Sequence, residues 1–342
     1  MDINEFKSRL KDGKLEGIYI FAGEEEYLIR HYLSSLRSAL NIEPAFAVFN
    51  NPVFDGDEVD FSAISEAIKA PPMMSDYKLV EWRHADFDSM GEKELSLLEA
   101  LIEEAEDYPY SIIAFTSEGE KLDFGTQKKP SKFVSRFGKR LNLLRFEKST
   151  DNQLYSWLKK HFDARGVSVT LDTVRALVFR SGHSMNVLYT EVEKLTALAL
   201  ARGRDYVTVD DVNEVSASTP ESETFALSNA ITERNKQKAY AALEELKIRR
   251  VDPGAVMGMV ARTYDELLSV AMLLEEGKNL SDIESLLKMN PYKVKIHAAA
   301  AKRYSAKRLA DITNELARVD AGSKFGGVSG YTAIEIFISK SI

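Results

Sequence analysis

The sequence predicts a parallel α/β domain followed by domains built only of helices. Up to about residue 147, short runs rich in β-branched and aromatic residues alternate with helical patterns. Such alternation is typical of a parallel sheet covered by helices on both faces. Beyond that point nearly every apolar pattern repeats with helical spacing, and 342 residues are too many for one hydrophobic core. We therefore expect the class α/β plus all-α.

The first domain is expected to span residues 1–147. Its expected strands, in chain order, are 17–22, 45–49, 77–82, 110–116 and 141–146. The segment SIIAFTSE, which follows Tyr110, is almost continuously apolar, as in a central strand that is covered on both sides. Its expected helices lie near 24–40, 57–69, 91–106 and 126–138.

A small helical domain is expected at 148–217, and a third, entirely helical domain at 218–342. Two helices of the small domain begin with capping-box pairs, Thr150 with Gln153 and Thr208 with Asp211. The segment SASTPESET, 216–224, has the small, polar, proline-containing composition of a linker. The other expected helices lie near 170–180, 184–202, 225–232, 234–248, 253–276, 280–288, 291–303, 305–320 and 331–340.

Composition excludes several classes of site. The chain has no cysteine, which excludes disulfides, thiolate metal sites and cysteine nucleophiles. Its five histidines never have metal-ligand spacing, and GHSMN lacks the final glycine of a nucleophile elbow, so we expect no metal and no catalytic residue. No apolar run approaches the ~20 residues that span a bilayer, and the N-terminus lacks a signal-peptide core. We expect a cytoplasmic protein without membrane contact.

The first strand leads into a segment where a nucleotide-binding α/β domain would carry its phosphate loop. A G-x-x-x-x-G-K-[ST] pattern counted from Gly23 places Leu28 at the second glycine and Ile29 at the lysine. Three glutamates, residues 24–26, occupy the loop itself and would repel a triphosphate. The segment therefore predicts a degenerate phosphate loop that binds no nucleotide.

Two further features of nucleotide hydrolysis are missing. Arg83 and His84 follow the strand expected at 77–82, where a P-loop ATPase would place an Asp-Glu pair for magnesium and water. The helix expected at 184–202 has no arginine in its first turns, although related ATPases use one there to sense the γ-phosphate. These absences predict a chain without cofactors.

Four segments in a fixed order resemble the delta subunit family of bacterial DNA polymerase III. They are IYIFAGEEEYLI, MMSDYKLVEWRHADF, SGHSMNVLYTEVEKL and LARVDAGSKFG, and the resemblance covers essentially the whole chain. It implies a P-loop-type, AAA+-like domain that binds no nucleotide, a small helical lid and a C-terminal helical collar that packs with sister subunits.

The resemblance also implies a mechanical function in DNA replication. Such a subunit binds the sliding clamp (the beta subunit) and opens or holds open its ring for loading onto primed DNA. Its partners are sister clamp-loader ATPases and a delta-prime-like subunit. No intrinsic catalysis is implied, since nucleotidyl transfer belongs to the DNA polymerase holoenzyme.

In this family a hydrophobic pair before the KLV strand contacts the clamp, and here that pair is Met73 and Met74, preceded by Pro71 and Pro72. Prolines end the helix and stiffen the loop, and methionine adapts to irregular apolar pockets. The alternative is that one methionine fills the core of its own domain.

Residues 121–140 hold seven Lys or Arg against one Asp, whereas residues 86–107 hold nine acidic residues and one lysine, although the formal net charge of the whole chain is −8. The candidate DNA-facing residues Lys128, Lys129, Lys132 and Arg136 recur at three- and four-residue spacing and are expected to share a helix face. The alternative is a solvated helix opposite Phe133 and Phe137.

Two rival functions remain open. An active ATPase subunit of the same loader family requires a phosphate-loop lysine, which is missing near Gly23. A scaffold with a relic nucleotide domain would have no affinity for a sliding clamp.

Overall fold

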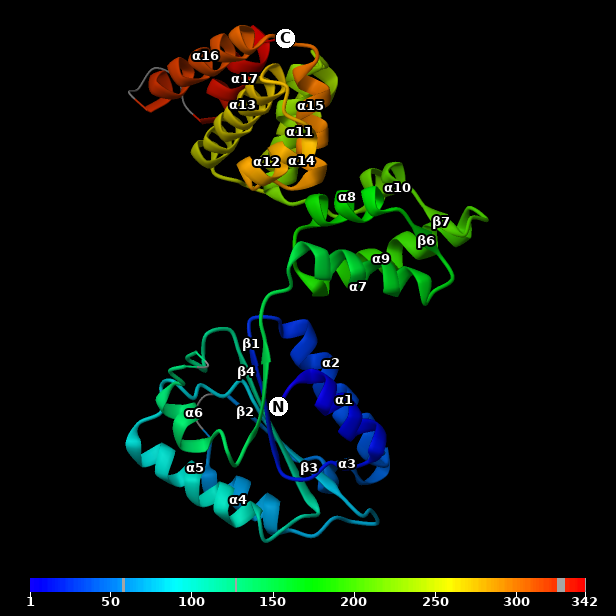
Figure 1. Ribbon diagram of the computed structural model, residues 1–342, viewed down its shortest axis with the longest axis vertical. Helices are drawn as coiled ribbons and strands as arrows, with labels where there is room; N and C mark the ends of the chain where they lie inside the picture. The colour runs from blue at the N-terminus through cyan, green and yellow to red at the C-terminus, as the bar shows by residue number, and fades with distance from the viewer. Residues whose placement is uncertain (57–58, 127, 325–329, 342) are drawn as a thin grey trace. The chain divides into compact units, whose positions relative to one another are not determined.

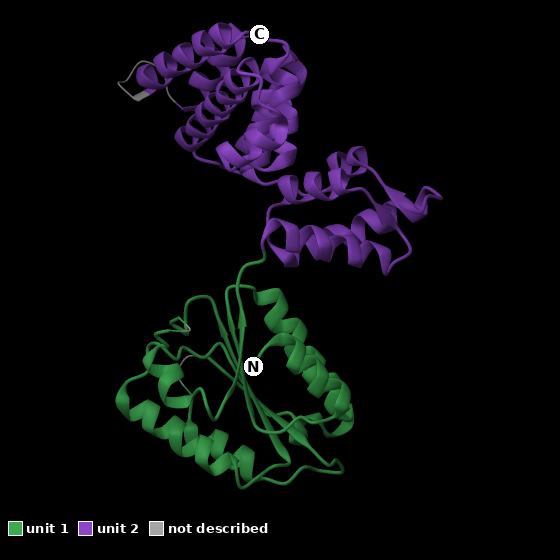
Figure 2. Cartoon of the chain, viewed as in Figure 1, with its two compact units in different colours: residues 1–149 green, residues 150–342 purple. Residues whose placement is uncertain are grey.

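The structure is a computed structural model that describes residues 1–56, 59–126, 128–324 and 330–341. The chain forms two compact units, residues 1–149 and 150–342 (Figure 2). The division into three domains at 1–147, 148–217 and 218–342 stays a prediction. No helix in the described ranges is long and apolar enough to cross a membrane.

Unit 1 is built on a parallel five-stranded sheet, which confirms the predicted α/β class. Its strand order is β2-β3-β4-β1-β5, and every adjacent pair is parallel (Figure 1). The strands are β1 (Ile18–Gly23), β2 (Val53–Asp55), β3 (Lys78–Arg83), β4 (Ser111–Glu118) and β5 (Asn142–Phe146).

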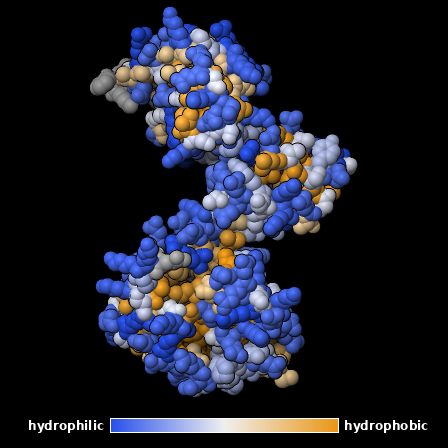
Figure 3. Space-filling view, in the orientation of Figure 1, coloured by the Kyte–Doolittle hydropathy of each residue, from blue (hydrophilic) through white to orange (hydrophobic). Residues whose placement is uncertain are grey.

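Helices cover both faces of this sheet. One face carries α1 (Ile3–Asp12) and α2 (Glu26–Leu40), and its core includes Phe6, Tyr19 and Leu33. The other face carries α4 (Phe61–Lys69), α5 (Glu92–Ala105) and α6 (Lys132–Phe137), and its core includes Trp82 and Phe115. Apolar residues appear between these two helical layers in the space-filling view (Figure 3). Side chains of β1 and β4 enter both cores, which explains their continuous apolar sequence.

The strand expected at 45–49 is wrong. The structure has a 3-10 helix, η1 (Pro44–Phe46), followed by the one-turn helix α3 (Ala47–Asn50), and the edge strand β2 begins only at Val53. Pro44 starts the 3-10 turn, because its ring presets the backbone for a helical first position. The β propensity of AFAVF is therefore outweighed by Pro44, which starts a helical turn directly before this segment.

The helix expected at 126–138 is much shorter. Helix α6 begins at Lys132, with Ser131 as its N-cap accepting from the N–H of Val134 at 3.1 Å. Pro130 disfavours a helical conformation at the residue before it. Lys128 and Lys129 therefore lie in a loop, and they do not share a helix face with Lys132 and Arg136.

Unit 2 begins with helices and one small ladder. Both predicted capping boxes, at Thr150 and Thr208, are confirmed. The elements are α7 (Asp151–Asp163), β6 (Ser168–Val169), α8 (Leu171–Ser181), α9 (Met185–Ala201), β7 (Tyr206–Val207) and α10 (Val209–Val215), with β6 and β7 paired in parallel.

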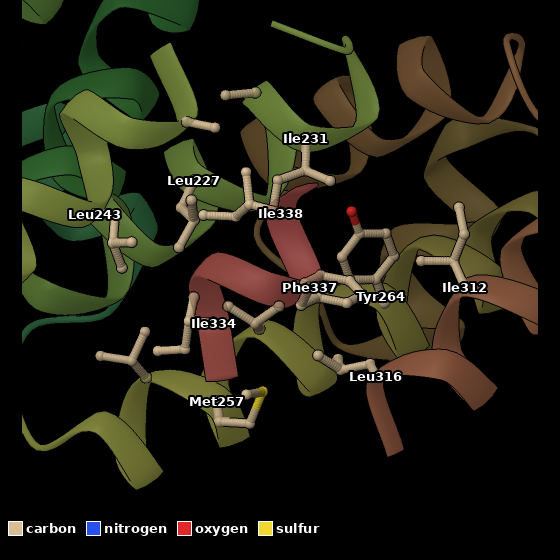
Figure 4. Close-up of a cluster of buried hydrophobic side chains, with 14 of the residues drawn as sticks. Leu227, Ile231, Leu243, Met257, Tyr264, Ile312, Leu316, Ile334, Phe337 and Ile338 are labelled. Carbon is tan, nitrogen blue, oxygen red and sulfur yellow. The ribbon is translucent and has the colours of Figure 1, made fainter. Parts of the chain in front are cut away.

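The rest of unit 2 is helical, as predicted. Its helices are α11 (Pro220–Thr232), α12 (Lys236–Ile248), α13 (Pro253–Glu275), α14 (Leu280–Leu287), α15 (Pro291–Ala301), α16 (Ala306–Lys324) and α17 (Gly330–Ser341). The core gathers Tyr264 of α13 and Phe337 of α17 between side chains of α11, α12 and α16 (Figure 4). Of the segment LARVDAGSKFG, residues 325 and 326 lie outside the described residues.

The predicted linker at 216–224 is wrong in its second half. Helix α11 starts at Pro220, with Thr219 as N-cap and a capping box to Ser222. A threonine followed by proline is a strong helix start, since Pro suits the first helical position. The Thr-Pro pair in SASTPESET is this local signal, although the overall composition of the segment is that of a linker.

Candidate functional site: the two edges of the sheet

The carboxyl edge of the unit 1 sheet contains the crevice in which parallel α/β proteins bind ligands. The chain leaves β1 towards α2 on one face and leaves β4 towards α6 on the other, so a topological switch point lies between these strands. The N–H of Gly119 donates to the carbonyl of Gly23 at 2.8 Å across this point. A cavity of about 370 Å³ opens beside it.

Carboxylates dominate the lining of this carboxyl-edge cavity. Glu24, Glu120, Asp123 and Glu147 contribute four acidic groups, and Arg145 contributes the cation. The Arg145 guanidinium is already engaged, because it pairs with Glu147 at 3.0 Å and lies 5.3 Å from the centre of the Phe124 ring. The lining is thus the electrostatic opposite of a triphosphate site.

The predicted phosphate-loop positions are occupied by packing residues. Ile29 is fully buried in the core beneath α2, and Leu28 packs against the same core. Gly23 has φ +134°, and a Cβ there would come within 2.3 Å of the Phe146 carbonyl oxygen. Close passage of β5 therefore explains the glycine. Absence of nucleotide binding stays a prediction.

The cation at the end of β3 belongs to a buried ion network centred on Glu81, which sequence analysis missed. Glu81 is fully buried, and its carboxylate accepts from Arg37 at 2.6 Å, Arg83 at 2.8 Å and Asn51 at 2.9 Å. Burial alone would raise the pKa of Glu81, but these hydrogen bonds hold it below its ordinary value. A charged residue inside an apolar strand pattern, EW in YKLVEWR, was the available signal.

The amino edge of the same sheet carries residues 71–74, which we call the methionine loop. Helix α4 ends at Lys69, and Ala70 is extended (φ −61°, ψ 126°), as expected before proline. Met73 is 40 % exposed and Met74 is 82 % exposed, so neither is a core side chain. Met74 has φ +53°, a left-handed conformation that is costly for a side chain of this size.

Side chains from neighbouring strands hold the root of the methionine loop. The last carbonyls of α4 lack partners within the helix, and three donors from β3 and β4 or just before them satisfy these carbonyls. Ser111 Oγ donates to Ile68 O at 2.7 Å, Tyr110 Oη to Lys69 O at 2.6 Å, and Lys78 Nζ to Ala70 O at 3.1 Å. Lys78 is almost fully buried, and burial lowers the pKa of its amine.

Asn50 holds the tip of the methionine loop. Its buried amide donates from Nδ2 to Met73 O at 2.8 Å and accepts from Met73 N at 2.7 Å, which satisfies both backbone groups of Met73. The next residue, Asn51, donates to Leu79 O at 3.0 Å and to Glu81. The loop is therefore fastened to α3, and Asn51 ties the end of α3 to β3, contacts that no sequence spacing indicated.

The basic run at 121–140 and the acidic run at 86–107 pair with each other in unit 1. Arg136 pairs with Glu92 at 2.6 Å and with Glu99 at 2.7 Å, both in α5, and Arg140 pairs with Glu103 of α5 and with Glu106, the residue that follows this helix. The guanidinium of Arg136 is thus engaged within the domain, while Phe133 and Phe137 are buried as expected.

Three lysines remain as candidates for DNA contact. Lys128, Lys129 and Lys132 are exposed and form no ion pair with any residue that the structure describes. Their contact with phosphate stays a prediction. The described ranges also contain no cluster of three or more His, Asp or Glu side chains arranged to hold a metal ion.

Fold and site together define a class: a parallel, doubly covered α/β domain with appended helices, acidic at the carboxyl edge where a nucleotide would bind. Two family models match the chain, "DNA polymerase III, delta subunit" over residues 19–147 and "DNA polymerase III delta subunit, C-terminal domain" over residues 221–341. The chain belongs to the DNA polymerase III delta subunit family, a clamp-loader family in DNA replication, which confirms the resemblance.

Individual relatives agree along nearly the full length. The DNA polymerase III subunit delta of Bacillus subtilis is 25% identical over 96% of this chain and 94% of that protein. A probable DNA polymerase III subunit delta of Aquifex aeolicus is 26% identical over 90% of this chain and 86% of its own length.

A solved structure has the same fold. The Bacillus subtilis DNA clamp loader delta protein covers 99% of this chain and 98% of its own, with a TM-score of 0.54 and 23% sequence identity.

Proposed function

We propose that this chain is a non-catalytic subunit that binds the sliding clamp and opens or holds open its ring, so that the clamp is loaded onto primed DNA in the cytoplasm. The observation that carries the proposal is the methionine loop: two exposed apolar side chains on backbone that Asn50 and Lys78 hold in place. Membership in the delta subunit family supports the sliding clamp as the partner.

The rigid backbone favours binding to an apolar pocket. A loop that is already ordered loses less conformational entropy on association. Burial of each methionine side chain contributes about 1.5–3 kcal/mol of favourable free energy before the costs of binding. Pro72 lies directly before the pair and further restricts it.

The carboxyl-edge cavity supports the absence of catalysis and of any cofactor. Four carboxylates line it, and a buried isoleucine occupies the position of the phosphate-loop lysine. ATP bound by sister ATPase subunits must then control when the clamp is gripped, and a delta-prime-like subunit is a further partner. Residues 148–217 serve as the lid in this proposal, and residues 218–342 pack with those subunits as the collar.

The test is direct measurement of complex formation with the cognate clamp. We expect a one-to-one complex by size-exclusion chromatography that forms equally well with and without Mg·ATP. We also expect that adding this chain speeds the release of the clamp from circular DNA. Replacing both methionines, Met73→Ala with Met74→Ala, should weaken the Kd about 100-fold, since ~3 kcal/mol of apolar burial is lost.

The matched control is Met272→Ala, which removes an exposed methionine from α13 in unit 2. It should leave the Kd unchanged. No binding of the wild-type chain to the clamp would favour the scaffold function, and tight Mg·ATP binding by the purified chain would favour an active ATPase subunit.

A further inference from the structure

The short helix α3 carries two exposed apolar side chains with no packing role. Val48 is 83 % exposed and Phe49 is 54 % exposed, and neither belongs to a core of unit 1. The residue that ends the helix, Asn50, is by contrast fully buried. One turn of helix thus presents apolar groups to solvent while its last side chain faces inward.

The inward side chain joins α3 to the methionine loop. Asn50 bonds both the N–H and the carbonyl of Met73, 23 residues away along the chain. Two hydrogen bonds to one residue fix orientation as well as distance. Val48 and Phe49 therefore lie within a few residues of the point at which the methionine loop is held.

Both segments are free of charge. Residues 44–54, PAFAVFNNPVF, and residues 70–75, APPMMS, contain no Asp, Glu, Lys or Arg, in a chain that is 29% charged. Segments that expose Val, Phe and Met and carry no charge of their own favour an apolar recess on a partner, because none of their side chains is an ionic group that must be desolvated on docking.

We propose that α3 and the methionine loop form one docking surface for the sliding clamp, with Asn50 locking the two segments together. The proposal rests on the function proposed above and extends it from one loop to two segments. Val48 and Phe49 contact the clamp beside Met73 and Met74, whereas Asn50 is a positioning residue that contacts only its own chain.

The first experiment replaces the contact side chains of α3. The double variant Val48→Ser with Phe49→Ser should weaken the Kd for the cognate clamp at least tenfold, mainly through faster dissociation. The matched control, Leu200→Ser with Ile248→Ser, removes two exposed apolar side chains from α9 and α12 and should not change the Kd. Both changes are on the surface, so the thermal midpoint should stay within a few degrees of wild type.

The second experiment separates positioning from stability by a double-mutant cycle. Asn50→Asp keeps an acceptor for Met73 N–H and loses the donor to Met73 O, and it should weaken clamp binding about tenfold. The same change should have little further effect when Met73 and Met74 are already alanine, because the residues act as one unit. A purely structural role would weaken both backgrounds equally.

The outcomes distinguish the two proposals. Loss of binding in the methionine variant with unchanged binding in the Val48–Phe49 variant would overturn this inference and leave the proposed function intact. Failure of the wild-type chain to bind the clamp would overturn the proposed function. Equal losses from Asn50→Asp in both backgrounds would remove Asn50 as a positioning residue.

Discussion

At the carboxyl edge of the unit 1 sheet, four carboxylates surround an open cavity, whereas at the amino edge buried polar side chains hold an apolar loop. The parallel fold itself favours the opposite arrangement. Helix N-termini at the carboxyl edge offer N–H groups to anions. Loops at the amino edge ordinarily only connect a helix to the next strand.

The difference shows that a parallel α/β fold can keep its sheet and helices while its candidate binding surface lies at the amino edge instead of the carboxyl edge. Glu24 and its acidic neighbours oppose the attraction of the α2 N-terminus for phosphate. Lys78 and Asn50 form hydrogen bonds with the backbone at the root and at the tip of the methionine loop. An ordered loop loses less conformational entropy when its apolar side chains bind a partner. Glu81 links the two edges through Arg83 and Asn51.

The largest expected effect comes from an attempt to rebuild the phosphate loop. Ile29→Lys places an ammonium in a fully buried apolar site, so we expect the free energy of unfolding to fall by about 3 kcal/mol or more. Urea denaturation of the full chain measures this, and calorimetry should find no gain of Mg·ATP binding.

Leu28→Lys is the matched control for that variant, since Leu28 is only partly buried and lies one residue away. Leu28→Lys should lower the free energy of unfolding clearly less than Ile29→Lys does. A stable Ile29→Lys chain that binds Mg·ATP would show that the carboxyl edge is only one substitution from function, and the contrast between the edges would fail.

A smaller effect is expected from the residue that joins the edges. Glu81→Gln keeps the shape but loses the charge that Arg37 and Arg83 bind. It should lower the free energy of unfolding at pH 7 by about 2 kcal/mol. The loss is limited because both arginines are partly exposed and reach solvent. Urea denaturation at several pH values measures it.

The pH dependence of that difference follows from the depressed pKa of Glu81 in the folded chain. The stabilisation is fully present above the unfolded pKa of about 4.3 and is lost as pH falls through the lower folded value. The gap between wild type and Glu81→Gln should therefore shrink in acid. The exposed Glu43→Gln is the control, and a gap that stays constant below pH 4 would contradict this role.

The smallest expected effect is at the root of the methionine loop. Lys78→Met removes a buried amine whose pKa burial lowers, so stability at pH 7 should change by less than about 1 kcal/mol. Clamp affinity should nevertheless fall about threefold, because Ala70 O loses its donor and the loop loosens. Unchanged affinity would mean that Asn50 alone orders the loop.

Sequence patterns predicted the elements whose signals are local. Alternation predicted the sheet, and the threonine caps at Thr150 and Thr208 predicted their helices. The pattern failed at 45–49, where β propensity suggested a strand and the structure has η1 and α3. It also failed at Lys128 and Lys129, because Pro130 and Ser131 delay the helix.

The sequence by itself determined which groups are missing from the carboxyl edge and which apolar pair follows Pro71 and Pro72, since both depend on residue identity at neighbouring positions. Only the tertiary structure decided that Asn50 holds Met73 and that Glu81 gathers Arg37, Arg83 and Asn51. These contacts join residues up to 44 positions apart, and the hydrogen bonds form only after packing has brought buried polar groups within reach of each other.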